Sequence, residues 1–470
     1  MDFSNFLMMH QEAGLIAVFL ILLVYDMFST EKSKKYFRFT ACLLFGIHTF
    51  AGFLPHATGA AFGGMYFCSD MTVLMKNILN IGTLLVLMQS GQWLRSAEVK
   101  VREGEFYIIT IATLIGMYFM VSATNMMLLF IGIETASLPL ACLVAYNKYK
   151  EKSAEAGAKF VLISALSSGV MMFGLSFLYG ANGTMYFADM AEVITYTPMT
   201  VMGLVFFFAG LGFKISLVPF HLWTADVYQG APTGVTAYLS VVSKGAACFA
   251  LMFSLYHIFE NVSIVWHHFL WAISVVTIII GNLFAIRQKD IKRFFAFSSI
   301  SQAGYLLIGI LNGTQEGMAA TVYYVFVYLL ANLAIFGVIA AVENKSNRTD
   351  IAAFNGFYKS NPKLSFVMMI AIFSLAGIPP FAGFFSKFFI FASAAKEGEF
   401  LLVFIALVNT VVALYYYLLI IKAMFINQEE EQCVGLIKTD TYNKITLLLC
   451  SAGVILVGFF SCFYEYILKV

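Results

Sequence analysis

The sequence predicts an all-α polytopic membrane protein with fourteen transmembrane helices. Of its 470 residues, 61% are hydrophobic and only 11% are charged, whereas a soluble chain has about a quarter charged residues. The apolar runs are also long, as at 12–28 and 265–286. Such runs suit membrane helices of about 20 residues and not the alternating strands of about ten residues in a membrane β-barrel. The net charge of +2 does not favour a nucleic-acid partner.

Polar and turn residues divide the chain into fourteen predicted spans. They begin near residues 12, 37, 70, 106, 126, 153, 199, 232, 265, 291, 318, 364, 399 and 445. The first apolar run lacks a basic leader, so we expect it to be a retained helix and not a cleaved signal peptide. The cysteines have no CxxC spacing, so we expect small core residues and no metal or iron–sulfur ligands. They are Cys42, Cys68, Cys142, Cys248, Cys433, Cys450 and Cys462.

The basic residues orient these spans. Most of the 28 lysines and arginines fall in loops that follow odd-numbered spans. Because cytoplasmic loops collect basic residues, the sequence predicts that these loops are cytoplasmic and that both termini lie outside. The loop residues are Lys32, Lys34, Lys35, Arg38, Arg95, Lys100, Arg102, Lys148, Lys150, Lys152, Arg287, Lys289, Lys292, Arg293, Lys345, Arg348, Lys359, Lys363, Lys422, Lys438 and Lys444.

Five lysines fall inside predicted spans, where each costs roughly 2.5 to 3.5 kcal/mol at the helix centre. They are Lys76, Lys159, Lys214, Lys244 and Lys387. Lys76 lies only about two turns into its helix, so we expect its stem to extend to the interface. Lys214 and Lys244 lie too deep for that. We interpret these two as lining an internal polar route; buried ion pairs that hold helices together are the alternative.

Glu134 is the deep acid that matches these bases, and Lys159 on the next helix is its predicted partner. A structural salt bridge is one interpretation. The functional one is that the pair tunes protonation, since burial favours neutral lysine and a nearby carboxylate favours charged lysine. His221, which follows a proline near Lys214, is a candidate proton relay. Hydroxyl groups cluster around the charges, at Ser164, Ser167, Ser168, Tyr238, Ser240, Ser243, Ser298, Ser299, Ser301, Gln302 and Tyr305.

Two predicted spans are interrupted by proline, the seventh at Pro219 and the twelfth at Pro379 and Pro380. Such breaks free backbone groups and favour hydrated cavities. The first break comes about 113 residues after the start of span four and the second about 114 after the start of span nine. This spacing predicts two inverted five-helix repeats, spans 4–8 and 9–13. The predicted segments are 1–105, 106–258, 265–425 and 426–470.

The chain contains three longer motifs, FKISLVPFHLWTADVYQGAPTGVTAYLS at 213–240, RFFAFSSISQAGY at 293–305 and GIPPFAGFFSK at 377–387. These motifs resemble those of the antiporter-like membrane subunits of respiratory complex I. The resemblance covers residues from about 100 to 425. One departure is Ala225, where the family commonly has proline before the aspartate. The resemblance implies that Glu134, Lys214, Lys244 and Lys387 carry protons and that Lys159 is the partner of the glutamate.

The resemblance further implies a non-redox subunit of a proton-translocating NADH:quinone oxidoreductase in a bacterial cytoplasmic membrane. NADH, FMN, iron–sulfur clusters and quinone are then expected in partner subunits, with other membrane subunits of the assembly as partners and no cofactor in this chain. The sequence shows no GxGxxG nucleotide motif after a strand. The alternative is a subunit of a multisubunit Na⁺/H⁺ antiporter or membrane-bound hydrogenase. A lipid or polysaccharide flippase is disfavoured because it needs a wide cavity and not a file of lysines.

Overall fold

The computed structural model describes residues 4–30, 34–96, 98–427, 434–460 and 462–470, so Lys32 and Cys433 lie outside the described residues. The described chain is mostly helical, and its one sheet pairs two short antiparallel strands. Twelve of its helices are long and apolar enough to cross a membrane. Two shorter apolar helices, Phe37–Ala51 and Pro362–Ala376, lie where two further spans are predicted. The chain is therefore a multi-pass membrane protein.

The chain forms two compact units. The division into four segments remains a prediction from the sequence. The first unit is Met1–Lys214 with Val242–Trp266, and the second is Ile215–Val241 with His267–Val470. The elements of the first unit are α1 (Ser4–Met8), α2 (His10–Met27), α4 (Phe37–Ala51), β1 (Gly59–Ala61), β2 (Tyr66–Cys68), α5 (Asp70–Gln89), α6 (Gly91–Leu94), η1 (Lys100–Arg102), α7 (Glu103–Ser122), α8 (Met126–Val144), α9 (Glu151–Asn182), α10 (Phe187–Val193), α11 (Pro198–Ile215), α14 (Lys244–His257) and η3 (Glu260–Val262).

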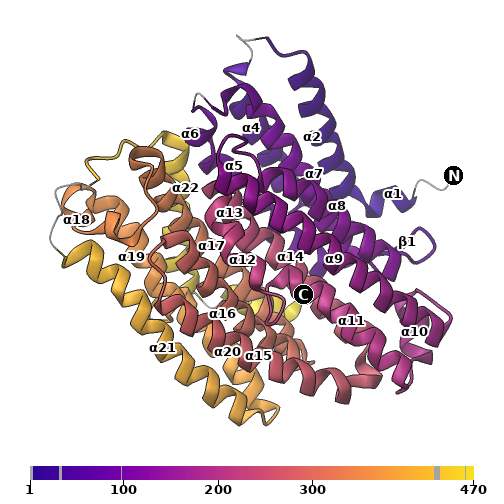
Figure 1. Cartoon of the computed structure of the whole chain (residues 1–470). Helices are drawn as coiled ribbons and strands as arrows, with labels where there is room; N and C mark the ends of the chain where they lie inside the picture. Colours follow the sequence, from indigo (N-terminus) through magenta and orange to yellow (C-terminus); the bar gives the residue numbers. More distant parts are fainter. Residues whose placement is uncertain (1–3, 31–33, 97, 428–433, 461) are drawn as a thin grey trace. The chain divides into compact units, whose positions relative to one another are not determined.

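In the first unit, α7 is the central helix, since it packs against α2, α4, α5, α8 and α14 (Figure 1). Glycines bring α7 and α8 into backbone contact. A Cβ atom added at Gly116 of α7 would lie 2.3 Å from the backbone nitrogen of Ala136, and one at Gly132 of α8 would lie 2.7 Å from that of Met120. Small residues at membrane-helix contacts permit such close approach.

We therefore expect Gly116→Ala to destabilise the chain, by about 1 to 3 kcal/mol for an overpacked contact. The added methyl group meets backbone atoms, which cannot rotate away. Gly169→Ala in α9 is the matched control, because nothing lies within 4 Å of its added Cβ. Thermal unfolding of the purified protein in its complex measures both. Equal stability of the two variants would contradict the close contact.

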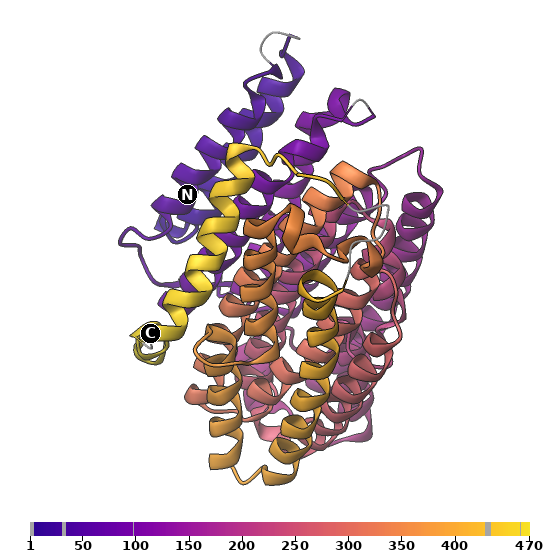
Figure 2. The same cartoon turned by 90° about the vertical axis from the view of Figure 1, so that its left-hand side faces the viewer.

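The second unit is built around α17, which packs against α13, α16, α19, α20, α22 and α23. Figure 2 shows the orange helices α19 and α20 beside the gold α21. The elements of this unit are α12 (Leu222–Gly230), α13 (Thr233–Tyr238), most of α15 (Ser263–Ile286), α16 (Ile291–Leu311), α17 (Gln315–Ser346), η4 (Ile351–Phe354), α18 (Phe357–Ser360), α19 (Pro362–Ala376), α20 (Ala382–Lys396), α21 (Phe400–Phe425), α22 (Thr441–Phe459) and α23 (Cys462–Lys469).

Both predicted interruptions are present. Helix α11 ends at Ile215 and α12 begins at Leu222, while α19 ends at Ala376 and α20 begins at Ala382. The second break has a clear local cause. Gly377 adopts a φ of +83°, which suits glycine at a helix end, and prolines 379 and 380 lack the N–H that would continue the helix. The breaks leave carbonyl groups of the last turns available to other partners.

The described cysteines only partly follow the expectation of core positions. All six are free thiols, and Cys68, Cys248 and Cys450 are buried. Cys142 and Cys462 are exposed and Cys42 is half-buried, so the core interpretation is wrong for Cys142 and Cys462. Their apolar neighbours on α8 and α23 made them look like core residues, but in a membrane protein an apolar residue is equally stable on the outer face.

Candidate functional site

Lys387 lies at the break between α19 and α20. Its side chain is buried, and its ammonium group donates hydrogen bonds to the carbonyl oxygens of Leu375 (2.8 Å) and Ala376 (3.3 Å), at the end of α19. The same nitrogen lies 5.2 Å from the ring centre of Tyr305 on α16, a favourable cation–π arrangement. The broken helix therefore supplies the acceptors that a buried ammonium group needs.

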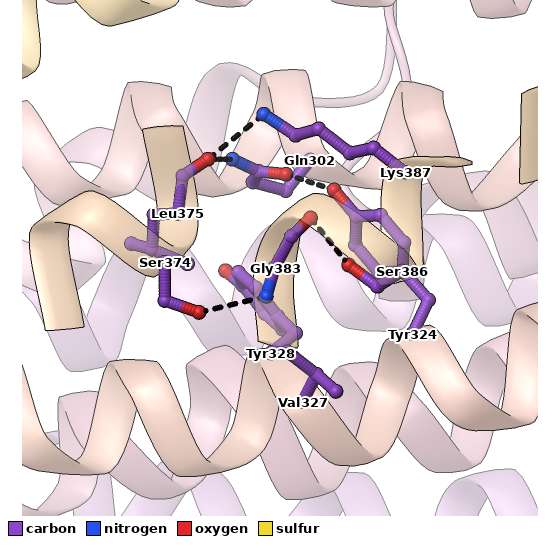
Figure 3. Close-up of a pocket in the computed structure, with 9 residues that line it drawn as sticks. All are labelled: Gln302, Tyr324, Val327, Tyr328, Ser374, Leu375, Gly383, Ser386 and Lys387. Carbon is purple, nitrogen blue, oxygen red and sulfur yellow. Dashed lines mark hydrogen bonds between the residues drawn. The ribbon is translucent and has the colours of Figure 1, made fainter. Parts of the chain in front are cut away.

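A small cavity adjoins Lys387. It is lined by polar groups of α16, α17, α19 and α20, among them Gln302, Tyr324, Ser374 and Ser386 (Figure 3). The cavity is roughly large enough for one water molecule. Lys387 thus has fixed protein acceptors on one side and space for water beside it.

Gln302 extends the polar contacts of Lys387 across the second unit. Its amide nitrogen donates to the Leu375 carbonyl (3.5 Å) and to the Tyr417 hydroxyl (3.2 Å), and its amide oxygen accepts from Tyr324. Ser298 and Tyr417 are 2.5 Å apart through their hydroxyl oxygens. In Figure 3 the Lys387 and Gln302 nitrogens both point to the Leu375 carbonyl. The hydroxyl cluster of span ten therefore connects to Lys387; Tyr324, Tyr417 and the Leu375 carbonyl are further members that sequence reasoning missed.

In the first unit, serines of α9 connect Glu134 to the helix of Lys214. Ser168 donates a hydrogen bond to the Glu134 carboxylate on α8, and Ser167 donates to the Gly210 carbonyl on α11 (3.4 Å). Gly210 lies one turn before Lys214. Lys214 is buried, and its nitrogen meets no hydrogen-bond partner in the part of the chain that the structure describes.

Lys159 pairs with an acid of its own helix. Its ammonium group lies 2.6 Å from the Glu155 carboxylate one turn earlier on α9, and its side chain is 39% exposed. The predicted Glu134–Lys159 partnership stays a prediction. The prediction rests on sequence order, since Lys159 lies one helix after Glu134.

Lys244 is the first residue of α14 and is buried. A π-helical turn, Leu239–Ser243, directly precedes it between α13 and α14. Such turns insert one residue into an α-helix and occur often at functional sites. The buried hydroxyl of Ser240 in this turn donates to the Ala237 carbonyl (2.8 Å). The sequence gives no proline or glycine signal within residues 239–243 for this π-turn.

His221 lies between the two halves of the seventh span, at the N-cap of α12. Its ring is half-buried, and its Nδ1 atom has no hydrogen-bond partner among the described residues. The imidazole of His221 therefore lies at the break in the seventh span. Its role as a proton relay remains a prediction.

The expectation for Lys76 is wrong. Its side chain does not extend to an interface: it is completely buried, and its ammonium group lies 2.6 Å from the equally buried Glu12 carboxylate of α2. Glu12 stands three residues into α2, at the start of the first apolar run, so the sequence did not mark it as a partner. The position of Lys76 along its helix suggests how close it lies to the membrane surface, but it does not show whether neighbouring helices cover the side chain. That burial depends on the packing of α2.

Charged pairs also fix α12 and α13 within the second unit. Arg293 of α16 lies 2.5 Å from the Asp226 carboxylate of α12. Lys292 donates to the Ala231 carbonyl (2.8 Å) and lies 3.6 Å from Glu343 of α17, which accepts a hydrogen bond from Thr233. Lys292, expected in a loop, is in fact buried. These bonds hold α12 and α13 against α16 and α17.

The loop before η4 braces the start of α16. Thr349 donates to the Asp290 carboxylate (2.6 Å), whose other oxygen caps α16 through the backbone nitrogens of Lys292 and Arg293. Arg348 donates two hydrogen bonds to Asp350, and these lower the pKa of that carboxyl group. In the described ranges, no group of three or more His, Cys, Asp or Glu side chains is arranged to hold a metal ion.

A broken-helix bundle with buried lysines at the breaks defines a class of protein, the antiporter-like membrane subunits. Residues 123–413 match the family model described as NADH:quinone oxidoreductase/Mrp antiporter, TM, and the chain belongs to this family. It is 59% identical to the NADH-quinone oxidoreductase subunit N of Azobacteroides pseudotrichonymphae, covering 99% of this chain and 98% of that one. It is 53% identical to the subunit N of Phocaeicola vulgatus, covering 99% and 98%. The predicted resemblance is confirmed, including the likeness to subunit N suggested by the DVYQGAPT form of the first motif.

Solved structures agree with this assignment. A chain of respiratory complex I from Thermus thermophilus superposes with a TM-score of 0.81 at 27% identity, covering 98% of this chain and 99% of that one. A chain of the Mrp complex from Dietzia superposes with a TM-score of 0.87 at 18% identity, covering 100% and 96%. At that identity the second likeness shows the shared fold alone.

Proposed function

We propose that the chain is a proton-translocating membrane-arm subunit of a complex I-like NADH:quinone oxidoreductase, and that Glu134, Lys159, Lys214, Lys244 and Lys387 carry the protons, with His221 as a relay. The observation that carries the proposal is the setting of Lys387. A buried ammonium group is costly. Here the end of a broken helix supplies its hydrogen-bond acceptors, the Tyr305 ring lies against it, and a cavity adjoins it. These features support a group that exchanges protons.

The contacts of Lys387 suit a change of charge. A charged lysine has three N–H donors and no acceptor. The carbonyls of Leu375 and Ala376 accept two of them, and water in the adjoining cavity would accept the third. A proton passed to that water leaves a neutral amine that still donates to the two carbonyls. Gln302 extends these polar contacts, since its amide nitrogen donates to the Tyr417 hydroxyl and its amide oxygen accepts from the Tyr324 hydroxyl.

Glu134 and Lys214 supply the corresponding pair in the first unit. A charged Glu134 carboxylate would favour the charged form of Lys214, and Ser168 donates a hydrogen bond to that carboxylate. A movement of α8 relative to α11 would weaken this attraction and favour release of the lysine proton. Energy for such a movement is expected from redox chemistry in partner subunits, which would also hold NADH, FMN, iron–sulfur clusters and quinone.

The finer topology belongs to the same proposal. We infer fourteen spans in a bacterial cytoplasmic membrane, both termini outside, and two inverted repeats at spans 4–8 and 9–13. The two shorter helices α4 and α19 and the two matching breaks support this arrangement. Other membrane subunits of the assembly are the partners. Helix α21 exposes a continuous apolar face, including Phe400, Phe404 and Val411, which suits lipid or such a neighbour.

The alternative function, in a multisubunit Na⁺/H⁺ antiporter or membrane-bound hydrogenase, has the support of fold alone. A chain of the archaeal membrane-bound sulfane sulfur reductase superposes with a TM-score of 0.86 at 23% identity. The Mrp chain described above also shares this fold. The full-length relatives named subunit N favour the complex I assignment. Subunits that co-purify with the chain separate the two functions.

Vesicles that contain the assembled complex test the proposal. We expect Glu134→Ala, Lys214→Ala and Lys244→Ala each to abolish coupled proton uptake while the complex still assembles, because each removes a group that holds the proton's charge inside the membrane. Dye quenching during NADH oxidation reports the uptake, and co-purification reports assembly. Full uptake in all three variants would remove the proposed route.

A further inference from the structure

The first unit contains a second set of buried charges that the proposed route does not use. Glu12 and Lys76 are both fully buried and form an ion pair of 2.6 Å. Tyr66 of β2 joins them, since its hydroxyl donates to Glu12 (2.9 Å) and accepts from Lys76 (2.9 Å). Breaking such a pair is costly, but a pair of apolar residues would pack at least as well. Its presence therefore calls for a reason besides stability.

The pair belongs to a polar face of α5. Thr72, Lys76, Asn80 and Thr83 are all buried, and their spacing of four, four and three residues places them on one side of the helix. Beyond Thr83 the buried residues of that helix are apolar until Gln89. The polar face thus runs from the start of α5 and stops inside it.

The same face has unused hydrogen-bonding capacity. Tyr118 of α7 donates to the Asn80 amide oxygen (2.5 Å), and His48 of α4 lies 3.1 Å from the same hydroxyl. The Asn80 amide nitrogen and the Gln11 amide oxygen have no hydrogen-bond partner in the described part of the chain, although both residues are at least 98% buried. Buried polar groups are nearly always satisfied by protein or by water. These two atoms therefore indicate water positions along α5.

Helix geometry gives the depth of this face. Thirteen residues separate Asp70 from Thr83, which is about 20 Å of helix at about 1.5 Å per residue, against a hydrocarbon core of about 30 Å. Helix α14, whose first residue is Lys244, packs against both α5 and α7. The polar face therefore extends from one membrane surface to just beyond the middle of the bilayer, beside the helix that begins with Lys244.

We propose that the polar face of α5, with Glu12, Tyr66 and Tyr118, is a water-filled half-channel that exchanges protons between the outer membrane surface and the Lys244 region. The proposal rests on the proposed function, because it gives the proton a path to one side. In this path the charges of Glu12 and Lys76 cancel each other, and water molecules carry the proton past the pair. The outer side follows from the basic-loop orientation, which places the start of α5 outside.

Two variants test the half-channel in vesicles of the assembled complex. Glu12→Leu with Lys76→Met removes both charges together. Thr83→Val removes a hydroxyl that donates to the Leu79 carbonyl of its own helix. We expect both to lower NADH-driven proton translocation by about tenfold or more, since each dries the path and about 1.4 kcal/mol of added barrier is tenfold in rate. Wild-type translocation in both variants, with Lys244→Ala inactive, would overturn the half-channel and leave the proposed function standing.

Cysteine labelling gives an independent readout that a purely structural role would not change. Thr83→Cys is expected to react with a small, charged methanethiosulfonate added outside sealed right-side-out vesicles. Leu43→Cys, on the exposed apolar face of α4, is expected not to react, and the wild-type chain gives the background from native cysteines. An unreactive Thr83→Cys would overturn the proposal, even if the charge-free variant failed to assemble.

Discussion

Replacing Lys387 by methionine is expected to lower NADH-driven proton translocation by about tenfold or more. Methionine keeps the length and much of the volume of the side chain but cannot hold a proton. A charge at the bilayer centre without a fixed polar group costs roughly 2.5 kcal/mol or more, and about 1.4 kcal/mol corresponds to tenfold in rate. The Leu375 and Ala376 carbonyls also lose their donor, so a modest loss of stability should accompany the loss of translocation.

Lys396→Met is the matched control, because it makes the same change on the same helix. The Lys396 side chain is 64% exposed and pairs with Glu316 at the surface. We expect its vesicles to translocate protons at the wild-type rate, with both complexes fully assembled on native gels. Equal translocation by the two variants would show that the buried position of Lys387 has no special role.

Replacing Glu12 alone by leucine is expected to cause the largest loss of stability, about 3 to 5 kcal/mol, because it leaves the Lys76 ammonium group buried without its counter-charge. The same change with Lys76→Met should recover most of that loss, since neither charge is then stranded. Thermal unfolding of the purified complex, followed through release of this subunit, measures both variants.

Glu316→Leu provides the comparison for the Glu12 series. It also removes the acid of an ion pair, but that pair lies at the surface with Lys396, where the loss should stay within about 1 kcal/mol. If Glu12→Leu costs no more than Glu316→Leu, Lys76 has another way to reach water and the buried pair is not the reason for its position.

Much of the fold could be predicted because the membrane imposes strong local rules. Apolar runs of about 20 residues and proline breaks are local features of a sequence, and both breaks appear where the prolines stand. The deep position of Lys387 and the hydroxyls of span ten were readable for the same reason. The exposed thiol of Cys142 was not, because lipid and protein interior accept the same apolar residue types.

The pairing of charges could not be predicted, because it depends on which helices pack together. Lys76 looked close to the surface, yet α2 and β2 bring Glu12 and Tyr66 against it. The serines of α9 also bond Glu134 and the Gly210 carbonyl of α11, and the spacing of the charges does not predict these contacts. The π-turn before Lys244 had no sequence signal, since nothing in 239–243 breaks a helix.

The most direct test of the central claim is the number of protons translocated per NADH oxidised when Lys214, Lys244 and Lys387 are all changed to methionine in one assembled complex. We predict that the coupled proton uptake of sealed vesicles is abolished. Co-purification of the subunits and NADH oxidation should establish that the complex remains intact. A wild-type proton-to-NADH ratio in that triple variant would contradict the account, because protons would then cross without these three buried amines.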